Sequence, residues 1–196
     1  MDLVYIPLAM ALWGALHSLT ASLAFKEKAA RLFGRGAMRF YRLFYNGFSL
    51  LTFLPVMALV ALPPHRVFYS VPAPWNFLMG AGQGAAAFLA LLSVLQTDAL
   101  HFAGIKQLFV EDSKGQLVTN GLYKIVRHPI YTFSLLFLWL TPVMTDKTLV
   151  FYLGATLYFI AGAYFEERKL LREFGEEYAE YMKSTPMLAP GLVFRK

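Results

Sequence analysis

Apolar residues gather along the chain in long blocks, separated by shorter stretches that hold most of the charged side chains. A helix needs about 20 mostly apolar residues to cross the hydrocarbon core of a bilayer. Five blocks come near this length, and the fourth is the shortest. They cover residues 4–25, 41–62, 75–96, 129–144 and 149–165. The pattern predicts an all-α integral membrane bundle with about five transmembrane helices.

The pattern changes after the fifth block, where apolar residues recur at helical spacing with glutamates between them. This is typical of an amphipathic helix that lies on a membrane or against a bundle. Its apolar members are Leu170, Leu171, Phe174, Tyr178, Tyr181 and Met182. Pro186 and Pro190 should end this helix. The brief joint at residues 144–148 predicts that the fourth and fifth helices form an antiparallel hairpin.

The length of 196 residues fits a single domain, 1–196, with three spans in 1–97 and the hairpin and tail in 98–196. Hydrophobic residues make up 58% of the chain and charged residues 15%, whereas a typical soluble domain is about 25% charged. This composition excludes a disordered chain. The chain has no cysteine, which excludes a disulfide scaffold and thiolate metal sites.

The net charge of +6 could indicate a nucleic-acid partner, but its distribution favours membrane lipids. Residues 26–42 hold six lysines and arginines against Glu27 alone, a net of +5. Positive charge beside apolar blocks marks cytoplasmic loops. We therefore expect a multi-pass protein of the cytoplasmic membrane, with its N-terminus outside, its C-terminus inside and no nucleic-acid partner.

Several isolated small and polar residues lie within the apolar blocks or at their ends. Gly80 and Gly84 have the small-xxx-small spacing that lets two helices approach closely. The histidines lack the spacing of a metal motif, so we expect no metal site. His17 lies within the first block, where it is either a functional group or a residue hydrogen-bonded to a neighbouring helix. His101, at the end of the third block, is either an interface anchor or a substrate contact.

The polar side chains before the fourth block point to an anion site. Asn120-Gly121 is a turn signal, and Pro129 suits the first turn of a helix. Arg127 and His128 then lie at that helix's N-terminus, where free N–H groups attract carboxylate or phosphate. The alternative is that Arg127 merely reaches towards lipid headgroups.

Glu166 and Glu167 directly follow the fifth block. Adjacent carboxylates near a helix C-terminus are disfavoured by the helix dipole, so we expect a cationic partner. Arg127, Arg168 or a cationic ligand can supply it. The alternative is an ordinary solvated face.

These two stretches, in this order, resemble the isoprenylcysteine carboxyl methyltransferase superfamily. The matching positions are Gly121-Leu122-Tyr123, Arg127-His128-Pro129-Ile130-Tyr131, Glu166-Glu167, Phe174-Gly175, Tyr178 and Tyr181. Looser matches in the first half, among them Ala15-Leu16-His17-Ser18, resemble its bacterial branch. That branch includes methanethiol S-methyltransferases and proteins associated with denitrification genes.

The resemblance implies an S-adenosyl-L-methionine-dependent enzyme of the membrane, with its active site at the cytoplasmic face. The implied cofactor contacts are Gly115, Gln116, Leu117, Val118, Tyr123, His128, Pro129, Ile130, Tyr131 and Glu166. The carboxylate of the cofactor suits the helix end near His128, and Glu166 suits its ammonium group or ribose hydroxyls. Tyr123 and Tyr131 offer aromatic faces to adenine or the sulfonium. We expect Arg127, His128 and Glu167 to act in catalysis.

One position departs from the family pattern and bears on the substrate. Isoprenylcysteine enzymes carry a substrate-binding arginine four residues before the cofactor-binding glutamate, and here that position is Gly162. We therefore expect a small or lipophilic thiol as methyl acceptor, with His17 and His101 as further substrate candidates. The alternatives are an isoprenylcysteine carboxylate or a phospholipid amine as acceptor, and a non-catalytic accessory protein that keeps the fold.

Overall fold

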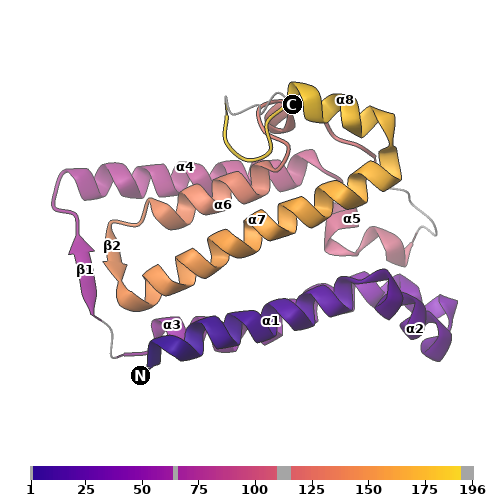
Figure 1. Cartoon of the computed structure of the whole chain (residues 1–196), viewed down its shortest axis with the longest axis horizontal. Coiled ribbons are helices and arrows are strands. Elements are labelled where there is room, and N and C mark those ends of the chain that lie inside the picture. Colours follow the sequence, from indigo (N-terminus) through magenta and orange to yellow (C-terminus); the bar gives the residue numbers. More distant parts are fainter. Residues whose placement is uncertain (1, 64–65, 110–115, 191–196) are drawn as a thin grey trace. The chain divides into compact units, whose positions relative to one another are not determined.

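The structure is a computed structural model that describes residues 2–63, 66–109 and 116–190. This part of the chain is mostly helical (Figure 1), which confirms the all-α class. In chain order, with η for a 3-10 helix, its elements are η1 (Asp2–Val4), α1 (Tyr5–Ala21), α2 (Leu23–Phe33), η2 (Arg35–Phe40), α3 (Tyr41–Ala61), β1 (Val67–Ser70), α4 (Trp75–Gln96), α5 (Ala99–Ala103), η3 (Lys106–Leu108), η4 (Gly121–Lys124), α6 (Pro129–Trp139), β2 (Val143–Thr145), α7 (Asp146–Phe174) and α8 (Glu176–Ser184).

The elements form two compact units. The first holds η1 to α3, α5, η3 and residues 145–154 at the start of α7. The second holds β1, α4, η4, α6, residues 155–174 of α7, and α8. The long helix α7 therefore contributes to both units.

In the first unit, α1 and α3 form an antiparallel pair. The Trp13 indole donates to the Ser49 carbonyl at 3.0 Å, and the Tyr41 hydroxyl donates to the Thr20 carbonyl at 2.5 Å. α1 ends at Ser22, whose side chain accepts from the N–H of Phe25 and caps α2. α2 then runs at 62° to α1. The predicted first span, 4–25, thus ends in a bend rather than continuing straight.

In the second unit, α4 and α6 lie side by side (Figure 1). Gln83 of α4 donates to the Phe137 carbonyl of α6 at 2.9 Å, whereas the far end of α4 reaches η4 through Gln96 and Leu122. The two helices are therefore antiparallel. Close packing occurs at Gly82, where an added Cβ would lie 3.1 Å from Leu140.

The prediction that Gly80 and Gly84 form the close helix contact is wrong. A Cβ added at either glycine meets no atom of the described residues within 4 Å. Gly82 lies between them on a different face of α4, and that face is the one that meets α6. Spacing alone identified a small-residue stripe but could not say which glycine faces a neighbour.

The second unit also confirms the predicted hairpin of the fourth and fifth helices. The Trp139 indole donates to the Thr156 hydroxyl at 3.0 Å, and the rings of Tyr131 and Phe159 stack with centroids 5.3 Å apart. The end of α6 thus lies near residue 156 of α7, while the start of α6 lies further along it. This antiparallel arrangement carries the polar residues at the start of α6 towards the C-terminal half of α7.

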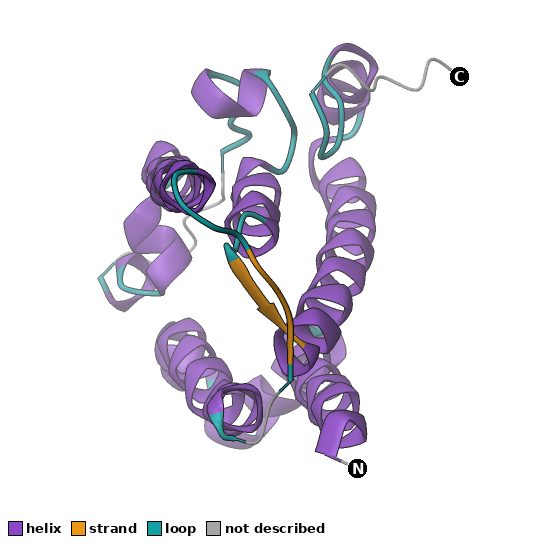
Figure 2. Ribbon diagram, turned by 90° about the vertical axis from the view of Figure 1, so that its left-hand side faces the viewer, coloured by secondary structure: helices purple, strands orange, loops and turns teal. Residues whose placement is uncertain are grey.

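The fourth apolar block, 129–144, is helical only as far as Trp139. α6 has 11 residues, about 16 Å, which is too short to cross a bilayer by itself. Pro142 cannot continue a helix, and the chain becomes extended and pairs β2 with β1, the orange strands in Figure 2. This pairing satisfies backbone groups that lipid could not.

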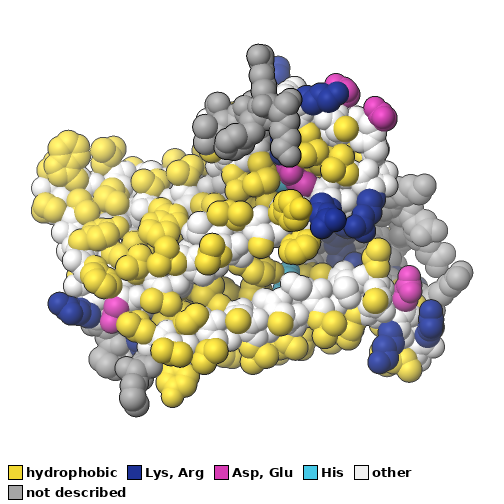
Figure 3. Space-filling view, in the orientation of Figure 1, with side chains coloured by type: hydrophobic (Ala, Val, Ile, Leu, Met, Phe, Trp, Pro, Cys, Tyr) yellow, Lys and Arg dark blue, Asp and Glu magenta, His cyan; other side chains and the backbone are white. Residues whose placement is uncertain are grey.

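Three helices of the described chain are long and apolar enough to cross a membrane, or four if the bent α1–α2 pair is one span. The three are residues Gly36–Ala61, α4 and α7. Leu12, Leu50, Phe77 and Leu157 are each more than 60% exposed, and hydrophobic side chains cover much of the face in Figure 3. Apolar surface on this scale fits contact with lipid, so the chain is a membrane protein.

The predicted C-terminal amphipathic helix is divided into two parts. α7 continues past the fifth apolar block to Phe174. Gly175 then adopts a φ of 55° and starts α8 in a new direction. Tyr178 and Tyr181 of α8 are buried, while Glu176, Glu177 and Glu180 are exposed. The apolar face of α8 was therefore predicted correctly, whereas Leu171 of α7 is 36% exposed and the break was not predicted.

Candidate functional site

The Arg127-His128-Pro129 segment forms the turn between η4 and α6 in the second unit. Pro129 occupies the first turn of α6, as predicted, and is fully buried. His128 precedes it with φ −123° and ψ 64°, because proline disfavours the helical region for the residue before it. The turn thus leaves the side chains of Arg127 and His128 at the N-terminus of α6.

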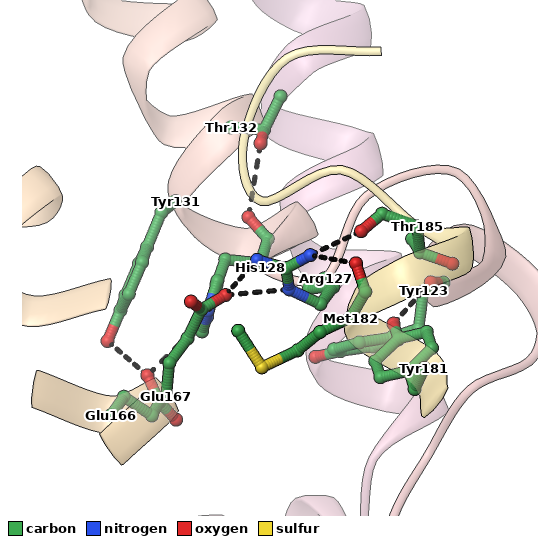
Figure 4. A network of polar contacts seen from close by, with 10 residues as sticks. All are labelled: Tyr123, Arg127, His128, Tyr131, Thr132, Glu166, Glu167, Tyr181, Met182 and Thr185. Atoms are coloured by element: carbon green, nitrogen blue, oxygen red, sulfur yellow. Dashed lines mark hydrogen bonds and ion pairs between the residues drawn. The ribbon is translucent and has the colours of Figure 1, made fainter. Parts of the chain in front are cut away.

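Arg127 forms a buried ion pair with Glu167 of α7 (Figure 4). Its Nε lies 2.6 Å and its Nη2 2.5 Å from the same carboxylate oxygen, Glu167 Oε1. Its Nη1 donates to the carbonyls of Met182 and Thr185 at the end of α8. Both charged side chains are less than 10% exposed. The expected cationic partner of the paired glutamates is therefore Arg127, and it pairs with Glu167.

His128 lies between the two glutamates and is 6% exposed. Its Nε2 is 3.4 Å from Glu167 Oε1, and its Nδ1 is 3.7 Å from Glu166 Oε2. Within the described residues, Nε2 is buried and has no partner at hydrogen-bond geometry. The imidazole is thus held beside two carboxylates with a ring nitrogen available for a proton or a ligand.

Glu166 differs from its neighbour because its side chain is 45% exposed. The Tyr131 hydroxyl donates to Glu166 Oε2 at 2.8 Å. The Tyr131 ring stacks on His128, at 5.5 Å and 7°, and on Phe159. Tyr131 therefore fixes an accessible carboxylate, while its ring is already engaged by two neighbours. The structure favours its hydroxyl, more than its aromatic face, as the functional group.

The chain after α8 runs against the same turn. The N–H of Arg127 donates to the Pro186 carbonyl at 2.9 Å, and the N–H of His128 donates to the Met187 carbonyl at 3.1 Å. The Thr132 hydroxyl donates to the Leu188 carbonyl at 2.7 Å. Residues 186–188 therefore bind the turn and the start of α6 through three consecutive carbonyls. From sequence, Pro186 and Pro190 indicated only a helix end.

Three tyrosines support the far side of the turn. The Tyr181 hydroxyl donates to the Tyr123 carbonyl, and the Tyr123 hydroxyl reaches the Ser93 carbonyl at 3.4 Å. Burial raises the pKa of Tyr181 to about 12 and the pKa values of Tyr123 and Tyr178 further. The Tyr178 hydroxyl is buried and has no hydrogen-bond partner among the described residues. These phenols stay protonated at neutral pH.

The predicted cofactor contacts do not all meet at one place. His128, Tyr131 and Glu166 do, and Pro129 and Ile130 begin the helix that carries Tyr131. Tyr123 lies on the other side of Arg127 (Figure 4). Gln116, Leu117 and Val118 lead into η4, and no hydrogen bond or ion pair joins their side chains to the cluster within the described residues. Gly115 lies outside the described residues.

The substrate candidates His17 and His101 belong to the first unit. His17 binds Ser49 through Nδ1 at 2.9 Å and Tyr45 through Nε2 at 2.6 Å, so it links α1 to α3 as the second interpretation of this residue expected. His101 Nδ1 lies 3.1 Å from the Gln107 side chain. Neither contact identifies a substrate group.

Comparison with known proteins identifies the family. Residues 77–177 match the family described as phospholipid methyltransferase, and these residues include the turn and both glutamates. The chain belongs to this family. This membrane methyltransferase is also 34% identical to methanethiol S-methyltransferase 2 of Bradyrhizobium diazoefficiens over 96% of the chain and 73% of that enzyme.

Two further relatives belong to the two enzyme classes that the motifs indicated, the methanethiol and the isoprenylcysteine methyltransferases. Methanethiol S-methyltransferase of Crocosphaera subtropica is 27% identical over 89% of the chain and 69% of that enzyme. Protein-S-isoprenylcysteine O-methyltransferase of Schizosaccharomyces pombe is 32% identical over 59% of the chain and 52% of that enzyme. No solved structure matches the chain. The superfamily and its bacterial branch were thus predicted correctly.

Proposed function

We propose that this methyltransferase uses S-adenosyl-L-methionine to methylate a small or lipophilic thiol of the methanethiol type. The observation that carries the proposal is the geometry of the two adjacent glutamates. Arg127 buries and neutralises Glu167, whereas Tyr131 holds Glu166 half exposed beside His128. The site therefore presents one oriented carboxylate and one imidazole, and the named thiol enzymes among its relatives supply the substrate class.

The residues present fit the proposed cofactor, which supplies an electrophilic methyl group on a sulfonium. Glu166 can accept hydrogen bonds from its ammonium group or ribose hydroxyls. The first N–H groups of α6 suit its carboxylate. The buried His128 Nε2 lacks a hydrogen bond within the described residues and lies 3.4 Å from Glu167 Oε1. His128, Tyr131 and Glu166 are the contacts that we expect to dominate, with Tyr123, Pro129, Ile130 and residues 115–118 around them.

A thiol reacts as its thiolate, so one proton must leave the acceptor for each methyl group transferred. We assign that proton to His128, whose imidazole lies beside Glu167 at 3.4 Å. Arg127 acts on the reaction by holding Glu167 in place. Alignment of the thiol with the methyl group then provides most of the rate enhancement.

Gly162 supports a thiol over a carboxylate acceptor. It lies one helical turn before Glu166 on the same face of α7, at the place where isoprenylcysteine enzymes have their substrate arginine. Within the described residues, its Cβ position is open. Without a cation there, a carboxylate acceptor has no counter-charge at this position, whereas a thiol binds in its neutral form before it loses its proton.

The test is headspace detection of dimethyl sulfide after methanethiol is given to purified protein with S-adenosyl-L-methionine. We expect turnover by the wild type and micromolar binding of the cofactor by calorimetry. Tyr131→Phe, which keeps the ring stack and removes the hydrogen bond to Glu166, should weaken cofactor binding about tenfold. The matched control is Tyr164→Phe, because Tyr164 is an exposed tyrosine of α7, and it should bind normally.

The family and the Schizosaccharomyces pombe relative favour a second candidate, methylation of a phospholipid amine or an isoprenylcysteine carboxylate. The same assay with these acceptors separates the candidates. Cofactor binding with methyl transfer to an amine or a carboxylate, and none to methanethiol, would refute the thiol proposal. Lack of cofactor binding in both detergent and nanodiscs would refute the cofactor.

A further inference from the structure

The first unit carries a basic segment that the proposed methyl transfer does not use. Residues 22–40 connect α1 to α3, and because these helices are antiparallel the segment lies at one end of the pair. Its cations are Lys26, Lys28, Arg31, Arg35 and Arg39, and its one acid is Glu27. The apolar helix α1 precedes the segment, and the candidate span Gly36–Ala61, which includes part of η2, follows it. We therefore expect both ends of the segment to lie near the same membrane surface.

Charge and apolar surface occur together on α2. Lys28 and Arg31 are exposed, Leu32 lies on the same side of the helix as Lys28, and Phe33 lies on another side. Leu32 and Phe33 are 69% and 74% exposed. Four of its 11 residues are charged, which keeps it out of the hydrocarbon core. Its axis turns 62° away from α1. These are the features of a helix lying in the interface between headgroups and acyl chains.

The exposed cations lack acidic partners. No carboxylate of the described residues lies within ion-pair distance of Lys28, Arg31 or Arg39. The Arg39 guanidinium lies over the Phe40 ring at 4.9 Å, and Phe40 is 49% exposed. In η2, as on α2, an exposed apolar side chain therefore lies beside a cation that has no acidic partner among the described residues. An anionic, partly apolar surface complements this combination.

We propose that α2 and η2 bind the anionic phospholipid headgroups of the leaflet at which α1 ends and α3 begins. The phosphates pair with Lys28, Arg31 and Arg39, and the acyl chains cover Leu32 and Phe33. A lipid surface is favoured over a soluble partner because the apolar helices on either side, α1 and α3, keep the segment near the bilayer. Each basic residue near such a surface strengthens binding about fivefold. The segment is therefore a lipid-binding surface at one end of the α1–α3 pair.

The full-length protein in vesicles of equal phosphatidylcholine and phosphatidylglycerol tests this. After mild detergent extraction, mass spectrometry measures the two lipids that remain bound. We expect the bound phosphatidylglycerol to exceed the bound phosphatidylcholine about fivefold. The triple variant K28Q/R31Q/R39Q should reduce the enrichment to nearly none. The control K124Q/K169Q/R172Q removes three exposed cations from the second unit and should keep it.

A conservative variant, K28R/R31K/R39K, keeps every charge and should retain the enrichment, so a folding defect in the glutamine variant cannot decide the result. Wild-type enrichment should also fall in 0.5 M salt. The proposal is overturned if phosphatidylglycerol is not enriched on the wild type, or if the glutamine variant retains it as the control does. Displacement of the lipid by 10 mM inorganic phosphate would also overturn it, because the ligand would then be a free anion.

Discussion

At the scale of single residues, Arg127 joins three parts of the second unit. Its guanidinium binds Glu167 of α7 and two carbonyls at the end of α8, while its own N–H binds Pro186. The planar guanidinium offers five donors in a fixed geometry, which a lysine ammonium cannot reproduce. Arg127 therefore acts as a structural clamp on the groups around His128.

Arg127→Lys should keep the charge and lose part of this network. We expect a loss of about 2 kcal/mol of unfolding free energy, because at least one buried hydrogen bond to a charged group is lost. The midpoint of thermal unfolding in detergent measures this loss. Arg172→Lys, at an exposed position of α7, is the matched control. Equal midpoints for the two variants would contradict the role of the guanidinium.

Gly162 offers a second test at this scale, on substrate choice. Its open surroundings within the described residues indicate that Gly162→Arg fits, since the new side chain would extend along α7 beside Glu166. We expect methanethiol turnover to fall about tenfold or more, because the long side chain fills space beside Glu166 and displaces a small acceptor. The rate of methyl transfer to a carboxylate acceptor should rise relative to the rate with the thiol. Comparison of the two rates in one assay shows whether this position sets the substrate class.

Residue patterns predicted which residues form the site but not which arginine pairs with which glutamate. Pro129 predicted the start of α6, and the adjacent glutamates predicted a cationic partner. The sequence offered Arg127, Arg168 or a cationic ligand as this partner. The structure pairs Arg127 with Glu167 and leaves Arg168 over the Tyr164 ring at 5.7 Å. Only the packing of α7 against the turn makes one glutamate buried and the other exposed.

At the scale of elements, the break between α7 and α8 depends on Gly175. Its φ of 55° is disfavoured for residues with a Cβ. Gly175→Ala should cost about 1–3 kcal/mol of unfolding free energy. Gly84→Ala, in the interior of α4 with open space at its Cβ among the described residues, should be neutral or stabilising. Thermal unfolding of the two variants in parallel checks this contrast.

α8 should also make stability depend on pH in the alkaline range. Burial raises the pKa of Tyr181 to about 12, from an ordinary value near 10. Below pH 10 the hydroxyl is protonated in both the folded and unfolded states. Between about pH 10 and 12 only the unfolded state ionises, so stability falls as pH rises.

Thermal midpoints measured from pH 8 to 12 should therefore be flat to about pH 10 and then fall. Tyr181→Phe should make the fall shallower, because one of the three buried phenols no longer titrates. Tyr164→Phe, an exposed tyrosine, should leave the profile unchanged. A profile that begins to fall near pH 8 would show that other groups dominate.

At the scale of the whole molecule, the absence of cysteine makes the proposed topology easy to test. Ser70 of β1 and Ser184 of α8 flank the second unit's helices and should lie on opposite sides of the membrane. Single variants Ser70→Cys and Ser184→Cys, treated with a membrane-impermeant maleimide, report the side of each. We expect Ser70→Cys to label from outside and Ser184→Cys only after the cytoplasmic face is opened. Labelling from the same side would refute the topology.

The sequence by itself determined that this is a helical membrane protein, because long apolar blocks have few other stable arrangements in lipid. Its motifs also determined the family. The tertiary structure decided what local patterns cannot contain: that Gly82 rather than Gly80 or Gly84 meets α6, and that the fourth block ends as a strand. It also decided which glutamate Arg127 neutralises. Each of these depends on contacts between residues far apart in the chain, so the exposed Glu166 beside His128 became visible only once α6, α7 and α8 were packed together.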